Sequence, residues 1–536
     1  MELKRLDNDD LLTILGTLNE FAERELPFDK RTKWDEEDIC PEDIVKTMLS
    51  EDVGLHLVFI PEEYGGLGGG AYDVYRLSCE FAKKDVGVAT SMLAVALGTD
   101  PIRVGCTPEQ KEKWMTRIAE EGLIVAYGVT EPEAGSNVES LKTKAERICD
   151  ENGNVTHYKL NGVKQFISNG GIADLYTILA KAPDGPTFFV VERTTDGIEP
   201  GKQEEKHGIR LSNTTQVILE DCIVPAENIV GTKEGEGIKQ SNEVFGFTRL
   251  MVAAFGLGGG LSALEKAIAY SKERKQFGDY LYKKQGYTHK LIVPNSVRLA
   301  AAQAYIEYVA ELLDSSDADR QIEGSVAKFF STESGNKAAE DAIQAHGGYG
   351  YCKEYEVEKI KRDVRILIIY EGTSEIQQNI IGVFRMRQVV KGKGKFIAGM
   401  AEGLEGNDAV NGSLAAKTAA FMDAAAYAAF KNKLSREQHI IFELATSIAE
   451  TETAIQLCKA AAKSGDKLQL AQARIWAAET AVSAPTRMIK AFKQSGKLTD
   501  DVMKELIAKA DLTGAIEAQG GILEDMNTVA ELLVED

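Results

Sequence analysis

The spacing of apolar residues changes twice along this chain of 536 residues, and these changes limit what it can fold into. Residues 1–122 carry apolar side chains at helical spacing, as in LLTILGTLNEFAERELP, where Pro27 predicts a helix end. Between 123 and 235 the pattern becomes short alternating runs, rich in β-branched and aromatic residues and separated by Gly, Asn, Asp and Pro. From residue 240 the helical spacing returns. The chain is therefore predicted to place a mostly antiparallel β domain between two helical domains.

The composition shifts again after residue 390. The stretch 391–412 is rich in Gly and Asn and is interpreted as a linker. Residues 413–536 are Ala-rich with helical spacing, which predicts an appended helical bundle. The predicted fold class is α+β and multidomain. It comprises an N-terminal all-α domain (1–122), a middle antiparallel β-barrel-like domain (123–235), an all-α helical-bundle domain (236–390) and a C-terminal helical extension (413–536).

Charge and cysteine usage exclude several kinds of function. The net charge of −21 and the lack of a basic stripe argue against nucleic acid as a partner. Seven scattered cysteines, never at C-x-x-C spacing, are typical of reduced thiols, and the dispersed histidines offer no metal site. The N-terminus shows no signal or transit character, and no unbroken apolar run has the length of a membrane span. We therefore expect a cytoplasmic protein without integral membrane association and without a metal.

Two stretches of the β region end in small and hydroxyl-bearing residues. YGVTEPEAGSN (127–137) follows a strand and offers the hydroxyls of Thr130 and Ser136 beside open main chain. QFISNGG (165–171) pairs an aromatic ring with the hydroxyl of Ser168. Two such strand ends suit a flat heteroaromatic ligand. The alternatives are a plain inter-strand loop and a core phenylalanine next to a turn.

Three stretches in the second helical region carry candidate anion ligands. Arg249, in TRLMVAA, lies on an otherwise apolar helix and predicts either a buried ion pair or an anion contact. ERKQFG (273–278) is either a helix end with solvated charges or a pyrophosphate site at Arg274. In QAHGGYGY (344–351), glycines open the main chain after a helix, which is a weak signal alone.

The stretch ILIIYEGTSEIQQNI (366–380) drives an apolar run into Glu371. Such a run predicts buried chain, and a carboxylate at its end is costly unless it is paired, protonated or used. Desolvation would raise the pKa of Glu371 towards that of a base able to act near neutral pH. The alternative is a carboxylate at the end of a surface strand.

Together, in this order and at this spacing, these stretches resemble the acyl-CoA dehydrogenase family of flavoproteins over about residues 30–390. The tail after 390 resembles the extension of larger members. The resemblance implies FAD between the β domain and the second helical domain, acyl-CoA as substrate, electron-transfer flavoprotein as partner, and an active site assembled across a homodimer or homotetramer.

The resemblance also implies roles for individual residues. Glu371 matches the catalytic base. Cofactor contacts are implied for Tyr127, Val129, Thr130, Ser136, Phe166, Ile167, Ser168, Arg274, Gln276, Phe277, Gln285, Gln344, Gly347, Gly348, Gly372, Thr373 and Glu375. Substrate contacts are implied for Ser136, Thr248, Arg249, Tyr370 and Glu371. Phe166 departs from the tryptophan common at its position, which keeps a stacked ring but leaves flavin exposure open.

The expected activity is therefore α,β-dehydrogenation of an acyl-CoA to trans-2-enoyl-CoA, with Glu371 taking the α-proton and flavin N5 the hydride. The segment 86–99 contains no basic residue to hold a distal carboxylate, which favours a neutral acyl chain. Two alternatives stay open: an acyl-CoA oxidase or enoyl-CoA reductase on the same scaffold, and a catalytically inactive flavin-bearing binding protein.

Overall fold

The computed structural model describes residues 3–316 and 318–535, apart from the side chains at 245–247. The chain divides into two compact units. The first unit comprises residues 1–251 and 310–319, and the second comprises 252–309 and 320–536.

The first unit opens with helices whose ends follow the sequence signals. They are α1 (Asn8–Glu25), α2 (Phe28–Glu37), α3 (Glu42–Leu49), α4 (Ala71–Lys84), α5 (Val86–Gly105) and α6 (Pro108–Glu121). Leu11, Leu15 and Leu18 of α1 are buried as their spacing predicts, whereas Leu12 is 55% exposed. Thr107 caps α6, because its hydroxyl accepts from the Gln110 N–H.

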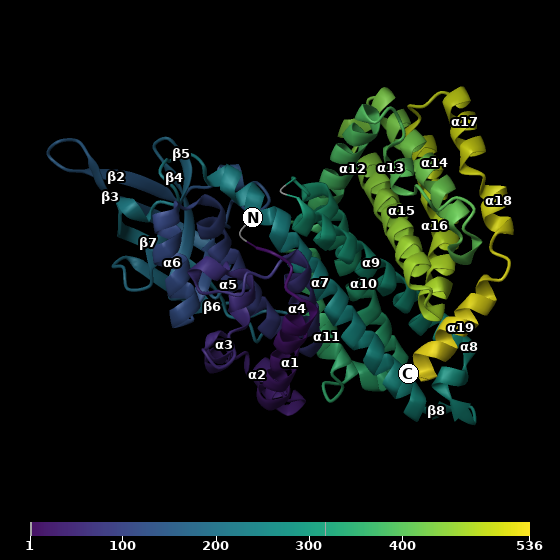
Figure 1. Cartoon of the computed structure of the whole chain (residues 1–536), viewed down its shortest axis with the longest axis horizontal. Coiled ribbons are helices and arrows are strands. Elements are labelled where there is room, and N and C mark those ends of the chain that lie inside the picture. Colours follow the sequence, from purple (N-terminus) through teal and green to yellow (C-terminus); the bar gives the residue numbers. More distant parts are fainter. Residues whose placement is uncertain (1–2, 317, 536) are drawn as a thin grey trace. The chain divides into compact units, whose positions relative to one another are not determined.

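The predicted β region forms one seven-stranded sheet (Figure 1). Its strands are β1 (Val125–Gly128), β2 (Lys144–Cys149), β3 (Val155–Ser168), β4 (Leu175–Ala182), β5 (Gly185–Glu192), β6 (Ile198–Gln203) and β7 (Thr214–Pro225). The order is β1-β4-β2-β3-β7-β6, with β5 paired to β4. Most pairs are antiparallel as predicted, but β4 runs parallel to both β1 and β2.

Helix α7 (Gly237–Glu273) crosses from the first unit into the second. Among the described residues it is the one helix that is long and apolar enough to cross a membrane by length and composition. Its sequence contains no unbroken apolar run of that length, because Gly and Ser interrupt the apolar residues. Nearly all of its apolar window is buried inside the protein, which is also true of core helices in soluble proteins.

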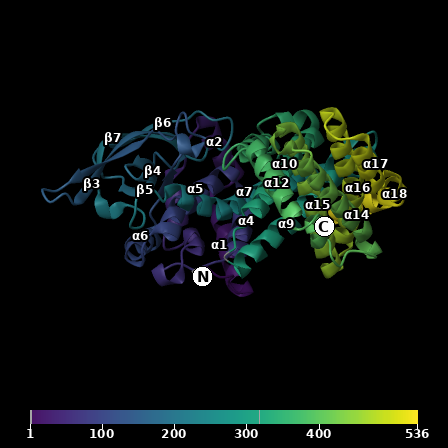
Figure 2. The ribbon, with the colours of Figure 1, turned by 90° about the horizontal axis from the view of Figure 1, so that it is seen from above.

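The second unit continues with helices on both sides of the predicted linker. Those before it are α8 (Gln285–Tyr287), α9 (Val293–Ser315), which starts in this unit, α10 (Gln321–His346), α11 (Val357–Val364) and α12 (Ser374–Lys391). A two-stranded ribbon, β8 (Lys275–Gln276) and β9 (Asp279–Tyr280), precedes them. Those after it are α14 (Gly412–Lys431), α15 (Gln438–Ser464), α16 (Lys467–Ser495), α17 (Asp500–Ala510), α18 (Leu512–Glu517) and α19 (Ile522–Glu535). Figure 2 shows α14, α15 and α16 grouped together.

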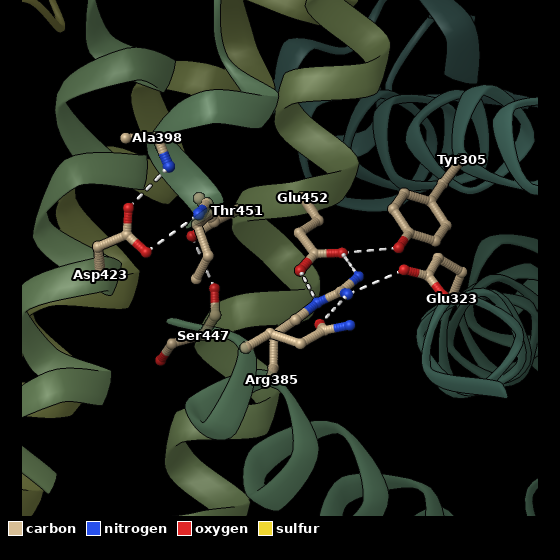
Figure 3. Close-up of polar contacts among 10 residues, drawn as sticks. Tyr305, Glu323, Arg385, Ala398, Asp423, Ser447, Thr451 and Glu452 are labelled. Carbon is tan, nitrogen blue, oxygen red and sulfur yellow. Dashed lines mark hydrogen bonds and ion pairs between the residues drawn. The ribbon is translucent and has the colours of Figure 1, made fainter. Parts of the chain in front are cut away.

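The stretch interpreted as a linker is folded onto the second unit. It contains α13 (Phe396–Met400), and Ile397, Leu404 and Val410 are almost fully buried. Asp423 of α14 accepts hydrogen bonds from the N–H groups of Ile397 and Ala398 (Figure 3). Composition alone does not show this packing, because Gly and Asn suit tight turns as readily as flexible linkers, and the partners of this stretch lie elsewhere in the sequence.

Candidate active site

Glu371 lies in a strained turn of the second unit. A short 3-10 helix (Arg365–Ile368) precedes it, and α12 begins three residues after it. Glu371 has φ +52° and Gly372 has φ +85°. Left-handed backbone is uncommon for residues other than glycine and is found preferentially where function requires it. Thr373 then caps α12 by accepting from the Ile376 N–H at 3.4 Å.

The apolar run before Glu371 is less buried than predicted. Leu367 is fully buried, but Ile369 is 46% exposed, and Tyr370 and Glu371 are half-buried. In a 3-10 helix only about every third side chain lies on the same face, so Leu367 is buried while the side chains next to it are not. The expected rise in the pKa of Glu371 therefore stays a prediction.

The structure brings the two strand-end stretches of the first unit together. The Gln165 N–H donates to the Thr130 carbonyl at 2.8 Å. The pairing of β3 with β7 shifts register between Lys164 and Ile167, which leaves Phe166 at φ +58° and 63% exposed. Bulges of this kind redirect side chains next to active sites. Phe166 is thus not a core residue, which removes one of the alternatives.

The neighbouring residues that were predicted to contact the cofactor differ in whether their side chains are exposed. Ile167 is 2% exposed and Val129 is 4% exposed, so both can offer main chain only. Ser136 is exposed, and Thr130, Ser168 and the ring of Tyr127 are half-buried. The first unit therefore presents an exposed aromatic ring, hydroxyls and main-chain groups at adjoining strand ends.

A buried ion pair that the sequence analysis missed holds this region. Lys164 Nζ lies 2.7 Å from Glu131 Oε1 and donates to the Val129 carbonyl at 3.2 Å. Both side chains are almost fully buried. Burial lowers the pKa of Lys164 to about 8. Burial acts to raise the pKa of Glu131, but the charge of Lys164 and hydrogen bonds outweigh it, and that pKa is lowered. The one feature of the sequence that could have indicated this ion pair is the position of Lys164 among inward-facing residues of a strand.

Five predicted cofactor ligands of the second unit line one cavity of about 550 Å³: Arg274, Gln276, Gln344, Gly347 and Gly348. Its wall also contains Tyr270, stacked on His346 at 4.4 Å, and Tyr349, whose ring centroid lies 5.7 Å from the Arg274 guanidinium carbon. A guanidinium, two amides and glycine main chain can bind phosphate oxygens and a nucleoside.

Two predicted ligands lie outside the described lining of this cavity. Phe277 is 97% exposed at φ +52°. Gln285 donates to Asn527 Oδ1 of α19 at 3.4 Å. In the first unit, the predicted CoA contacts Thr248 and Arg249 are buried on α7, at 0% and 5% exposure. Glu375 lies in the first turn of α12 and is exposed.

Comparisons with known proteins show which family the chain resembles. Family models described as the N-terminal, middle and C-terminal domains of acyl-CoA dehydrogenase match residues 8–122, 126–222 and 235–384. An acyl-CoA dehydrogenase of Bacillus subtilis is 37% identical over 353 residues, covering 65% of this chain and 90% of that protein. An NADH-dependent acryloyl-CoA reductase of Anaerotignum propionicum is 37% identical over 362 residues, covering 67% and 89%.

A solved structure extends the likeness of the fold to the tail. An acyl-CoA dehydrogenase from Bacillus anthracis, solved with FAD, has a TM-score of 0.86 at 24% identity and covers 99% of this chain and 95% of that one. The helices after residue 384 thus belong to a fold already observed, although they lie beyond the matched family domains. The predicted fold class is confirmed, and the chain belongs to the acyl-CoA dehydrogenase family of FAD-dependent enzymes, as a longer member with a C-terminal helical extension.

Proposed function

We propose that this protein catalyses the FAD-dependent α,β-dehydrogenation of an acyl-CoA thioester to trans-2-enoyl-CoA. The observation that carries the proposal is the turn of Glu371 and Gly372, where a half-buried carboxylate is kept on left-handed backbone directly before a helix. A strained, polar position of this kind is costly to maintain and marks a candidate functional residue.

The residues present fit FAD on structural grounds. The cavity at Arg274 offers a cation, amides and open main chain to a pyrophosphate and an adenosine. The exposed ring of Phe166 and the hydroxyls of Thr130 and Ser168 suit the flavin ring and its substituents. We assign Tyr127, Val129, Ser136, Ile167, Gly372, Thr373 and Glu375 to further contacts with the cofactor. When bound, FAD supplies the hydride acceptor.

Glu371 is assigned the proton transfer. Its carboxylate removes the α-proton of the thioester, and its position on a short turn fixes the carboxylate relative to that carbon. Tyr370, Thr248, Arg249 and Ser136 are assigned to the acyl-CoA. Helix α5 carries no basic residue over 86–99, so a neutral acyl chain is the proposed substrate.

Electron-transfer flavoprotein is the proposed electron acceptor, in the cytoplasm. A homodimer or homotetramer is proposed because Phe277 is 97% exposed next to Arg274 and Gln276, which match residues reaching a neighbouring subunit's cofactor.

A second function, enoyl-CoA reduction, is favoured by one observation. The acryloyl-CoA reductase is as similar in sequence as the Bacillus subtilis dehydrogenase. In that direction Glu371 would return the proton to the α-carbon.

The test is an anaerobic titration of the FAD-loaded protein with straight, branched, cyclic and aryl acyl-CoAs, monitored by flavin absorbance. Bleaching by at least one of them is the expected result, and no bleaching by any of them would refute the proposal. Turnover with a ferricenium acceptor identifies a dehydrogenase. Formation of stoichiometric peroxide under air identifies an oxidase, and consumption of NADH with an enoyl-CoA identifies a reductase.

A further inference from the structure

The main-chain carbonyls of the Glu371 turn are bound by two buried side chains. The carbonyl of Gly372 accepts from Lys328 Nζ at 2.7 Å and from Gln377 Nε2 at 3.1 Å. The carbonyl of Glu371 accepts from the same Gln377 amide at 2.9 Å. Lys328 and Gln377 are both 0% exposed. Hydrogen bonds to a buried ammonium group are stronger than neutral ones, so this turn is held firmly.

Helix α10 supports the turn from both sides. Lys328 binds the Gly372 carbonyl, and Glu333 Oε1 accepts from the Ser374 hydroxyl at 2.6 Å. Asn336 of the same helix donates to the Val364 carbonyl at 2.7 Å, before the turn. The segment that carries Glu371 is therefore attached to one rigid helix at its start and at its end.

These hydrogen bonds fix the side of the chain to which the N–H groups of the turn point. Both peptides are trans, so each N–H points opposite to the C=O of the same peptide. Because the carbonyls of Glu371 and Gly372 point to Lys328 and Gln377, the N–H groups of Gly372 and Thr373 point to the other side of the chain. A Cβ at Gly372 would lie 2.5 Å from Gln377 Nε2, so glycine is needed here for space as well as for φ.

From this geometry we infer that Lys328 and Gln377 are positioning residues for the catalytic carboxylate of Glu371. They act through the main chain, by holding Glu371 in the left-handed conformation that would otherwise relax. The inference rests on the proposed function, since it needs Glu371 to be the base. It also assigns a role to a lysine that the proposed reaction does not otherwise use.

Four variants test the inference. Lys328→Met keeps the aliphatic stem and removes the donor, and Lys328→Arg keeps a charged donor. Gln377→Met removes the amide that binds both carbonyls. Lys361→Met is the control, because Lys361 Nζ also donates to a main-chain carbonyl of α10, that of Asn336, at 3.2 Å, but binds neither carbonyl of the Glu371–Gly372 turn.

Two measurements separate positioning from stability. The first is the anaerobic rate of flavin bleaching by the acyl-CoA that bleaches the wild type fastest, at equal FAD content. The second uses a thioether acyl-CoA, with sulfur in place of the β-carbon, which cannot give up a hydride. Removal of its α-proton gives a long-wavelength charge-transfer band, whose pH midpoint reports the base.

A misplacement of about 1 Å can slow a reaction ~100-fold, so Lys328→Met and Gln377→Met are expected to slow bleaching by roughly that factor and to shift the pH midpoint of the band. Lys328→Arg should restore most of the rate, and Lys361→Met should match the wild type. Bleaching of FAD-loaded Lys328→Met within twofold of the wild type, with an unchanged midpoint, overturns the inference and leaves the proposed function intact. If Lys328→Met does not fold, the same criteria applied to Gln377→Met decide. Failure of the wild type to bleach refutes the proposed function itself.

Discussion

Arg385 of α12 and Glu452 of α15 form a two-pronged ion pair inside the second unit (Figure 3). Arg385 Nε and Nη2 lie 2.7 and 2.8 Å from the two carboxylate oxygens of Glu452, and both side chains are 0% exposed. Glu323 of α10 accepts a further bond from Arg385 at 2.9 Å, and the Tyr305 hydroxyl donates to Glu452 at 2.6 Å. The C-terminal extension is thus bonded, by a buried charge network, to the helix that begins beside Glu371.

Removing Glu452 should destabilise the second unit strongly. Glu452→Ala leaves Arg385 buried without its main partner, and breaking a buried pair typically costs about 3–5 kcal/mol. The urea midpoint, followed by circular dichroism, is expected to fall markedly. Glu437→Ala is the control, because Glu437 pairs with Lys497 on the surface, where such pairs contribute about 0–1 kcal/mol. Equal midpoints for Glu452→Ala and Glu437→Ala would contradict this account.

The periodic spacing of apolar residues predicted the helices and strands, whereas side-chain contacts between residues far apart in the sequence were not predicted. Helix α1 and the strands of the sheet follow from periodic burial, and Glu371 follows from a local motif. Lys164 and Lys328 could not be found this way, because their acceptors lie 33 and 44 positions away. A lone lysine in an apolar segment does not say which carbonyl or carboxylate it will meet.

Lys164 should make stability depend on alkaline pH. Burial lowers the pKa of its ammonium group from 10.5 to about 8, so between these values the unfolded chain binds more protons than the folded protein. The contribution of this group to stability therefore increases as pH rises through that window and is lost as pH falls through about 8. Relative to Lys164→Met, the wild-type melting temperature should rise by roughly 2–4 °C across the window.

Lys159→Met is the matched control for this prediction. Lys159 lies on the same strand, β3, and pairs with Glu146 and Asp221 near the surface. The difference in melting temperature between the wild type and Lys159→Met is expected to stay constant over the same pH range. A constant difference for Lys164→Met as well would show that Lys164 does not titrate there.

Glu371→Gln should separate binding from chemistry. The amide keeps the size of the side chain and the left-handed turn but cannot accept the α-proton. The variant is expected to retain FAD and to bind acyl-CoA, while bleaching slows by about 10²–10⁴-fold, the usual contribution of a general base. FAD content, ligand-induced spectral shifts and anaerobic bleaching measure these three properties on one sample. Bleaching near the wild-type rate would refute the assignment of Glu371 as the base.

Arg274 should govern retention of FAD. Its guanidinium lies in the cavity with Gln276 and Gln344, whereas Lys275 lies over the ring of Tyr280 and is not among the described lining residues. Losing a hydrogen bond to a charged group costs about 1.5–3 kcal/mol, so Arg274→Ala should weaken FAD binding by about 10- to 150-fold. Lys275→Ala should leave FAD binding close to the wild type. Quenching of flavin fluorescence during titration of the apoprotein gives the FAD affinity of each variant. Repeating the titrations at higher salt tests whether the charge of Arg274 contributes, because screening should weaken FAD binding by the wild type more than FAD binding by Arg274→Ala. Equal FAD affinities for the two variants would place the pyrophosphate elsewhere.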